Sequence, residues 1–223
     1  MTHRTRIKIC GITREEDLAE VVAAGVDAVG FVFYPKSPRY VTPERAAELC
    51  RLLPPFVTAV GLFVNASVDD VMATVRQVPL SLLQFHGDET VEQCDGLANA
   101  VNRPFIRAMR IGTATVADDL LKYASDYQTG SRLFAGLLLD TLVEGYGGSG
   151  KVFDWSLISK ELAPQVVLSG GLNVQNATDA VLRVRPYAVD ISSGVEHSKG
   201  IKDAAKIRAF IAAIRLADAS PNS

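Results

Sequence analysis

Residues 166–194 read VVLSGGLNVQNATDAVLRVRPYAVDISSG, and this stretch decides the fold. Two short apolar runs, Val166–Ser169 and Ala188–Ser192, flank a longer helical pattern at Val174–Arg183. Asn173 is expected to cap that helix, because its side chain can accept from the N–H groups of the first turn. Apolar runs without alternation indicate strands buried on both faces, as in a parallel sheet. The stretch therefore predicts a strand–helix–strand unit.

The same alternation of short strands and longer helical patterns extends towards both ends of the chain. Further helices are expected at Arg14–Ala24, Pro43–Leu53, Val68–Gln77 and Asp203–Leu216, and Thr42 is a candidate N-cap before Pro43. The remaining strands are expected at Arg6–Cys10, Ala28–Phe33, Val57–Val64, Leu82–His86, Phe105–Ile111 and Phe134–Asp140.

Eight parallel strands joined by right-handed crossovers can close into a ring. The predicted fold class is therefore α/β, a (β/α)8 TIM barrel in one domain that spans residues 1–217. An open, doubly wound sheet is the alternative architecture. The polar residues 218–223 are expected to form a disordered C-terminal tail.

The composition is that of an ordinary globular protein of one domain. The chain has 223 residues, 48% of them hydrophobic and 22% charged, with a net charge of −2. It has neither a block of lysine and arginine nor an apolar run long enough for a membrane helix, which argues against nucleic-acid and membrane partners. The absence of a signal-sequence pattern predicts a cytoplasmic location. Cys10, Cys50 and Cys94 form no CxxC pair, so neither a disulfide framework nor a zinc site is indicated.

Two loops that follow the last two expected strands form a candidate phosphate site. They contain Gly170 and Gly171 in the first loop and Ser192 and Ser193 in the second. Glycine lets backbone N–H groups approach an anion closely, and barrels frequently bind phosphate between these two loops. Glycines that only form turns are the alternative interpretation.

The stretch Gly145–Lys151 fits the GxGxxG pattern and nearly fits the P-loop pattern. However, Val152 stands where a P-loop carries the hydroxyl that binds Mg²⁺, and this would be the sixth strand–helix unit rather than the first. We interpret the stretch as an active-site loop that closes over substrate, not as a nucleotide site.

Cys10 ends the first expected strand, where a barrel enzyme carries its catalytic groups. Lys8 lies two residues earlier and points to the same face of the strand. Its ammonium is expected to lower the pKa of the Cys10 thiol and so to favour the thiolate. A small buried apolar side chain is the alternative role for an isolated cysteine.

Asp140 ends the sixth expected strand, after Leu137–Leu139. Strands one and six lie nearly opposite in an eight-stranded ring, so Cys10 and Asp140 can face each other across a bound sugar. An acid and a base on opposite sides of one substrate suit an aldose–ketose isomerisation. A helix or loop cap is the alternative role for Asp140.

Three further residues are candidates for contact with substrate. Asp190 ends strand eight and can either pair with Lys8 or bind a sugar hydroxyl, and these two possibilities rank equally. Arg39 lies on a loop stiffened by two prolines and can bind a carboxylate bidentately or remain solvated at the surface. His86 is either a substrate contact or a structural histidine.

These motifs together resemble the phosphoribosylanthranilate isomerase family, in order along nearly the whole chain. Serine replaces the threonine common in the family at residue 149, and phenylalanine replaces the common leucine at residue 85; neither change affects the candidate acid or base. The matching stretches are Lys8–Ile12, Gly30–Phe33, Ser37–Tyr40, Gln84–Gly87, Leu138–Asp140, Gly147–Gly150, Phe153–Trp155, Leu168–Leu172 and Asp190–Glu196.

The resemblance implies Cys10 as general base, Asp140 as general acid and Arg39 as the group that holds an anthranilate carboxylate. The backbone around Gly170–Gly171 and Ser192–Ser193 would hold the phosphate. The implied reaction is the Amadori rearrangement of N-(5-phosphoribosyl)anthranilate, a small sugar-phosphate substrate, without a cofactor or metal. A monomer is expected, since no large exposed apolar patch is evident in the sequence.

Other phosphate-binding barrels fit the sequence less well. The isomerase of histidine biosynthesis would use two aspartates, whereas strand one here offers Cys10. Indole-glycerol-phosphate synthase would need catalytic lysines at strand ends. A barrel that binds phosphate without catalysis has no need for Cys10 and Asp140 together.

Overall fold

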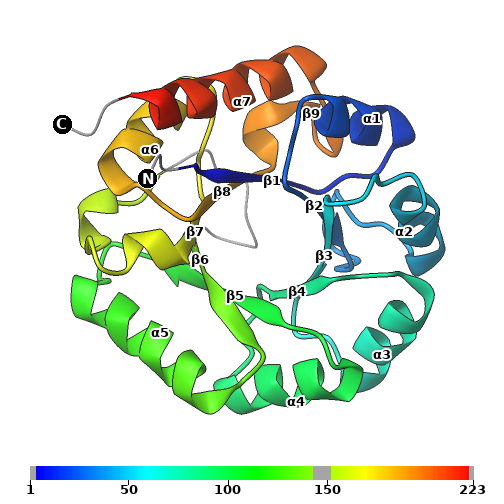
Figure 1. Cartoon of the computed structure of the whole chain (residues 1–223). Helices are drawn as coiled ribbons and strands as arrows, with labels where there is room; N and C mark the ends of the chain where they lie inside the picture. The colour runs from blue at the N-terminus through cyan, green and yellow to red at the C-terminus, as the bar shows by residue number, and fades with distance from the viewer. Residues whose placement is uncertain (1–3, 143–151, 221–223) are drawn as a thin grey trace.

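The computed structural model describes residues 4–142 and 152–220, and its centre is a closed barrel of eight parallel strands (Figure 1). Each strand pairs with its neighbours in chain order, and β1 pairs with β8 to close the ring. The strands are β1 Arg6–Cys10, β2 Ala28–Val32, β3 Thr58–Phe63, β4 Leu82–Phe85, β5 Phe105–Ile111, β6 Phe134–Thr141, β7 Val166–Leu168 and β8 Ala188–Ile191. The predicted TIM barrel is confirmed, and each predicted strand end lies within one residue of the observed end.

Helices surround the barrel and cover the outer face of its sheet (Figure 1). Between β6 and β7 the described residues form only two short 3-10 turns, η1 Trp155–Leu157 and η2 Ala163–Gln165. The α-helices are α1 Glu15–Ala23, α2 Pro43–Cys50, α3 Val68–Gln77, α4 Val91–Val101, α5 Ala117–Gly130, α6 Ala177–Val184 and α7 Ala204–Ala219. None of these described helices is long and apolar enough to span a membrane.

Local sequence signals fix several helix ends. Thr42 caps α2 by accepting from the Arg45 N–H at 3.2 Å, as predicted. The predicted cap of α6 was wrong, because Asn173 accepts from the N–H groups of Gln175 and Asn176 in the turn before that helix. The helix itself begins later, at Ala177.

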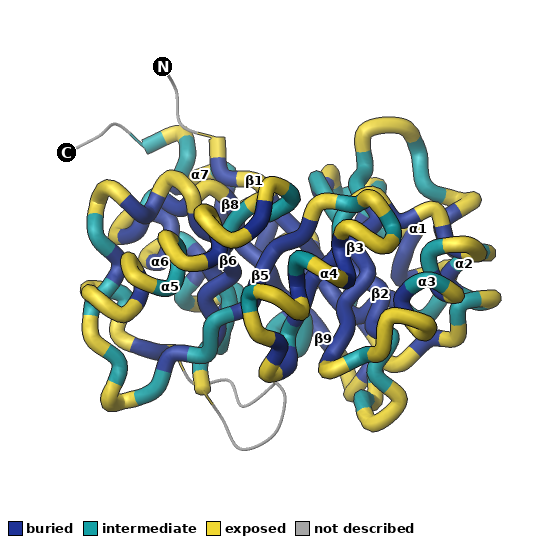
Figure 2. Tube along the Cα trace, turned by 90° about the horizontal axis from the view of Figure 1, so that it is seen from below, coloured by how far each residue is buried: buried dark blue, intermediate teal, exposed yellow. Residues whose placement is uncertain are grey.

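The strands are buried inside the molecule, whereas the outer faces of the helices are exposed (Figure 2). One apolar cluster packs between the strands and the helices, and it includes the fully buried rings of Phe31, Phe63, Phe85, Phe105 and Phe210. A smaller cluster fills the middle of the barrel. Its buried members are Ile106, Ala108, Leu138, Val167 and Ala188.

The end of α7 differs from the prediction. Asp218 was assigned to a disordered tail, but α7 continues to Ala219 and the Asp218 carboxylate accepts from the backbone N–H of Thr5 at 2.9 Å. Its other oxygen accepts from the Thr5 hydroxyl at 2.7 Å. The contact ties the last helix to the residue that precedes β1.

Asp218→Ala is therefore expected to lower the free energy of unfolding by about 1–3 kcal/mol, because the buried Thr5 N–H loses its carboxylate acceptor. Urea denaturation followed by circular dichroism measures the change. Ser220→Ala, two residues later at the end of α7, serves as the control and should leave the midpoint unchanged. Equal midpoints for Asp218→Ala and the wild type would show that the contact contributes nothing to stability.

Candidate active site

The carboxyl ends of the strands surround a cavity of about 110 Å³ in which the predicted site residues meet. Side chains from β1, β4, β6 and β8 and from the loops after β2, β7 and β8 line it. All of the predicted catalytic and substrate-binding residues are among its lining: Cys10, Arg39, His86, Asp140, Gly170, Gly171, Asp190, Ser192 and Ser193. The tertiary structure thus gathers into one place residues that are spread over most of the sequence.

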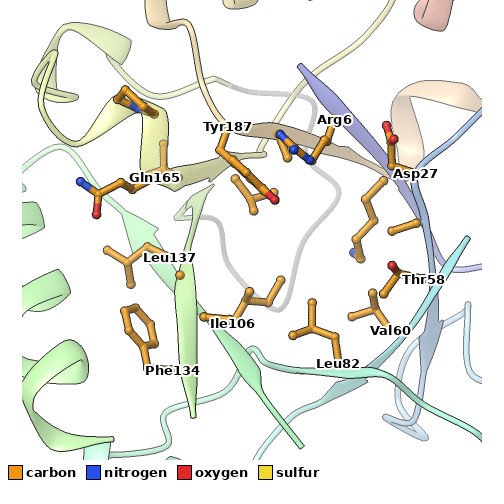
Figure 3. A pocket seen from close by; sticks show the side chains of 18 of the residues that line it. Arg6, Asp27, Thr58, Val60, Leu82, Ile106, Phe134, Leu137, Gln165 and Tyr187 are labelled. Atoms are coloured by element: carbon orange, nitrogen blue, oxygen red, sulfur yellow. The ribbon is translucent and has the colours of Figure 1, made fainter. Parts of the chain in front are cut away.

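A second cavity, of about 540 Å³, opens at the opposite end of the barrel (Figure 3). The apolar side chains of Val60, Leu82 and Ile106 line much of it. Asp27, the one acidic residue among the described residues that line it, accepts from Arg4 at 2.6 Å and from the Ile7 N–H at 2.9 Å. These contacts anchor the start of β1. The larger cavity therefore lacks the acid–base groups of the smaller one.

Cys10 lies at the end of β1 and is 5% exposed. Gly30 on the adjacent strand makes room for it, since a Cβ there would lie 2.6 Å from the Cys10 Sγ. Burial raises the pKa of the Cys10 thiol; the ammonium groups of Lys8 and Lys202 oppose this rise, whereas Asp190 adds to it. The pKa of the thiol is nevertheless raised overall from its ordinary value. The effect of Lys8 has the expected direction, but the loss of hydration outweighs it.

Asp190 pairs with Lys8 inside the barrel, which is the first of the two roles that the sequence left open for it. Lys8 Nζ lies 2.8 Å from Asp190 Oδ2, and each side chain is 6% exposed. Burial alone would lower the pKa of Lys8, but Asp190 and Cys10 raise it above its ordinary value, so the ammonium is retained. Asp190 Oδ1 has no hydrogen-bond partner among the described residues and belongs to a side chain that lines the site.

Asp140 is held by a hydrogen bond at each carboxylate oxygen. Oδ1 accepts from the Thr141 N–H at 2.8 Å, and Oδ2 lies 3.0 Å from His86 Nε2. Gly170 permits this arrangement: it has φ +78°, and a Cβ there would lie 2.8 Å from Asp140 Oδ1 and 2.4 Å from the Thr141 nitrogen. His86 therefore contacts the candidate acid.

Arg39 is fixed by a carboxylate rather than solvated. Its Nε and Nη2 donate to the two oxygens of Glu196 at 2.7 and 2.8 Å, and Lys202 Nζ donates to the same carboxylate at 3.0 Å. Burial would raise the pKa of Glu196, but Arg39 and Lys202 hold it below its ordinary value. Glu196 and Lys202 are brought together by two antiparallel strands, β9 Glu196–Ser198 and β10 Ile201–Lys202.

The two candidate phosphate loops lie side by side at the rim of the site. Ser169 Oγ donates to the Asp190 carbonyl at 3.0 Å, which ties the end of β7 to β8. Ser192 Oγ donates to the Cys10 carbonyl at 2.9 Å, which ties the second loop to β1. Gly171 also adopts a positive φ, of +68°. The loop interpreted as closing over substrate, Gly145–Lys151, lies outside the described residues.

Comparison with known proteins agrees with this geometry. The model of the N-(5'-phosphoribosyl)anthranilate (PRA) isomerase family matches residues 7–213. The N-(5'-phosphoribosyl)anthranilate isomerase of Herminiimonas arsenicoxydans is 69% identical over 223 residues, which cover 100% of this chain and 98% of the relative. The chain belongs to the N-(5'-phosphoribosyl)anthranilate isomerase family.

Solved structures of this isomerase family share the fold along nearly the whole chain. The enzyme from Thermotoga maritima superposes with a TM-score of 0.82 at 43% identity, covering 95% of this chain and 98% of that one. A second structure, an isomerase in complex with reduced 1-(o-carboxyphenylamino)-1-deoxyribulose 5-phosphate, gives a TM-score of 0.80 at 41% identity, with coverage of 95% and 98%. The family assignment decides against the histidine-pathway isomerase, the synthase and the non-catalytic barrel.

Three residues of the isomerase site had no assigned role in the sequence interpretation. Gln84 and Glu196 lie within stretches that carry the family resemblance, but nothing in the sequence shows that Gln84 contacts His86 or that Glu196 contacts Arg39. Lys202 follows those stretches and gave no signal. The side chain of Lys202 is fully buried, and the pairing of β9 with β10 brings its ammonium to Glu196. Across the described residues, no group of three or more His, Cys, Asp or Glu side chains could hold a metal ion.

Lys8→Met is expected to raise the pKa of the Cys10 thiol further, because it removes a cation that favours the thiolate and leaves the Asp190 charge unopposed. The pH dependence of alkylation by iodoacetamide, followed by mass spectrometry of the Cys10 peptide, measures the shift. Burial raises the pKa values of Cys50 and Cys94 to about 11 and about 12, so they contribute little background.

The double variant Lys8→Met/Asp190→Asn serves as the matched control for this measurement. It removes both members of the pair, and its alkylation midpoint should lie between those of the wild type and the single variant. The same midpoint in Lys8→Met and the wild type would show that Lys8 does not act on the thiol.

Proposed function

We propose that Cys10 is the general base and Asp140 the general acid of the isomerisation. The chain is an isomerase that converts N-(5-phosphoribosyl)anthranilate to 1-(2-carboxyphenylamino)-1-deoxyribulose 5-phosphate. The observation that carries the proposal is that the two side chains lie at the carboxyl ends of different strands, β1 and β6, and line the same cavity. Groups so placed can act on two sides of one sugar.

The reaction then consists of two proton transfers between the enzyme and the sugar. Asp140 gives its proton to the furanose ring oxygen, the C1′–O bond breaks, and the ring opens to a protonated Schiff base. The Cys10 thiolate next removes the C2′ proton, and the electron pair moves to form the enolamine, which tautomerises to the ketone. Lys8 and Lys202 favour the thiolate that the second step needs, because both are cations that lower its pKa.

Binding is proposed to use the two anionic ends of the substrate. Arg39 would hold the anthranilate carboxylate, since Glu196 fixes its guanidinium at the rim of the cavity. The backbone of Gly170–Gly171 and Ser192–Ser193 would hold the phosphate. Asp190, whose Oδ1 has no partner among the described residues, would accept from a sugar hydroxyl, and His86 would support Asp140.

Cys10→Ala and Asp140→Asn are each expected to lower kcat by about 10²- to 10⁴-fold, the range that general acid–base groups supply. A continuous fluorescence assay at neutral pH, with phosphoribosylanthranilate generated in situ, measures the rate. Binding of the reduced product analogue should persist in both variants, which shows that they remain folded. A variant that binds the analogue and turns over at the wild-type rate would remove that residue from the mechanism.

We also propose that the enzyme is a cytoplasmic monomer with one catalytic domain. Among the described residues, large exposed apolar side chains come from several different elements, for example Val68 on α3, Leu121 on α5 and Leu182 on α6. One solved relative from Thermotoga maritima is described as dimeric, so a dimer is the alternative.

Size-exclusion chromatography with light scattering tests the oligomeric state. A monomer gives a mass of 24.0 kDa that does not change over a hundredfold range of concentration. A mass near twice this value at micromolar protein would contradict the proposal.

A further inference from the structure

Gln84, on β4, is fully buried, with 0% of its surface exposed. Its amide is hydrogen-bonded to His86, which is in turn hydrogen-bonded to Asp140, the proposed acid. Gln84 Nε2 lies 3.0 Å from His86 Nδ1, and His86 Nε2 lies 3.0 Å from Asp140 Oδ2. A short chain of hydrogen bonds therefore links β4 to the carboxyl group on β6. Both Gln84 and His86 line the candidate site.

The amide orientation determines which nitrogen of His86 carries the proton. An amide N–H only donates, so the Nδ1 that faces it must accept, and the neutral ring then carries its proton on Nε2. That proton is donated to Asp140 Oδ2. His86 thereby has no lone pair directed at Asp140.

The reversed amide is less favourable in this environment. It would place the carbonyl oxygen against Nδ1 and turn the amide nitrogen to the buried position of Oε1, where no hydrogen bond is formed in the observed orientation. Buried N–H groups without a partner are rarer in proteins than under-satisfied carbonyl oxygens. In the observed orientation the buried atom without a partner among the described residues is the acceptor Oε1.

We propose that Gln84 is a positioning residue of the isomerase: it holds His86 in the neutral Nε2–H tautomer, so that His86 donates to Asp140 and cannot take the acid proton. The inference rests on the proposed role of Asp140 as general acid. Asp140 Oδ1 accepts from Thr141 and Oδ2 accepts from His86, so neither neighbour can receive a proton from the carboxyl group. The proton of Asp140 is thus directed to the substrate, and His86 keeps its own.

The chemistry of imidazole explains why this restraint matters. Histidine readily takes a second proton near neutral pH, and a carboxylate within hydrogen-bond distance favours the charged ring. The Gln84 N–H opposes this state, because a donor faces the nitrogen that would have to gain the second proton.

Nitrogen-15 NMR of the histidine ring tests the tautomer without any catalytic assay. The protein has three histidines, His3, His86 and His197, and the loss of one set of signals in His86→Gln assigns the ring. At neutral pH the wild type should show a protonated, pyrrole-type Nε2 and an unprotonated, pyridine-type Nδ1. Gln84→Met, which keeps the length but removes the donor, should lose this pattern and show exchange between states.

Gln84→Glu provides the second, opposite change. Its carboxylate accepts from Nδ1–H, so both ring nitrogens should become pyrrole-type as the imidazolium forms. The inference would be overturned if the Nε2–H tautomer of His86 were as fully populated in Gln84→Met as in the wild type. It would also be overturned if the His86 ring stayed neutral in Gln84→Glu. The two variants change the ring in different ways, so a general loss of packing cannot produce both results.

Kinetics separates positioning from direct substrate binding. Gln84→Met should lower kcat about tenfold or more and leave KM within about twofold, because it weakens a proton transfer and leaves Arg39 and the phosphate loops intact. Gln77→Met, at an exposed position on α3, is the matched control and should change neither constant. A raised KM with unchanged kcat would mean that Gln84 binds substrate through Oε1, and would overturn the inference.

The two proposals fail in distinguishable ways. Full activity in Asp140→Asn would remove the acid role, and the positioning role of Gln84 with it, whatever the NMR spectrum shows. Inactive Asp140→Asn together with an unchanged tautomer in Gln84→Met would overturn the positioning role alone and leave the acid assignment in place.

Discussion

The parallel pairing of β1 with β8 closes the barrel, and the rest of the structure depends on it. Its register places Lys8 directly beside Asp190, so closure brings a buried cation and a buried carboxylate to 2.8 Å inside the ring. Removing one partner from such a pair would leave an uncompensated charge in the interior, which is costly. The same pairing sets Cys10 and Ser192 next to each other at the rim of the site. A constraint of the fold is thus also a constraint on the active site.

The site combines cations and anions so that each reactive group has a defined electrostatic environment. Cys10 is buried, which disfavours the thiolate, but it lies near two ammonium groups that favour it. Glu196 shares its charge between Arg39 and Lys202, and so fixes a guanidinium at the rim without leaving a buried carboxylate unpaired. Asp140 has a hydrogen-bond partner at each oxygen. These contacts preorganise the site before substrate binds.

Much of the site was predictable from sequence because a parallel barrel places the ends of its strands in one ring. Cys10, Asp140 and Asp190 each end an apolar run, and Gly170 and Ser192 follow the last two strands, so position alone marked them as neighbours. The contacts of Gln84, Glu196 and Lys202 were not predictable in the same way. They depend on the direction in which a side chain points and on a hairpin that has no strong sequence pattern.

The sequence by itself determined the alternation of strands and helices, the parallel sheet and the identity of the family. Apolar runs, helix caps and glycine loops can be recognised from neighbouring residues alone. It did not determine the balance of charges at Cys10 or the partner of Asp190, since both depend on distances across the closed ring. It also misplaced the end of the last helix, where Asp218 looks like part of a polar tail but bonds to Thr5 at the other end of the chain. Local chemistry specifies the elements, whereas desolvation and long-range pairing arise only when the barrel closes.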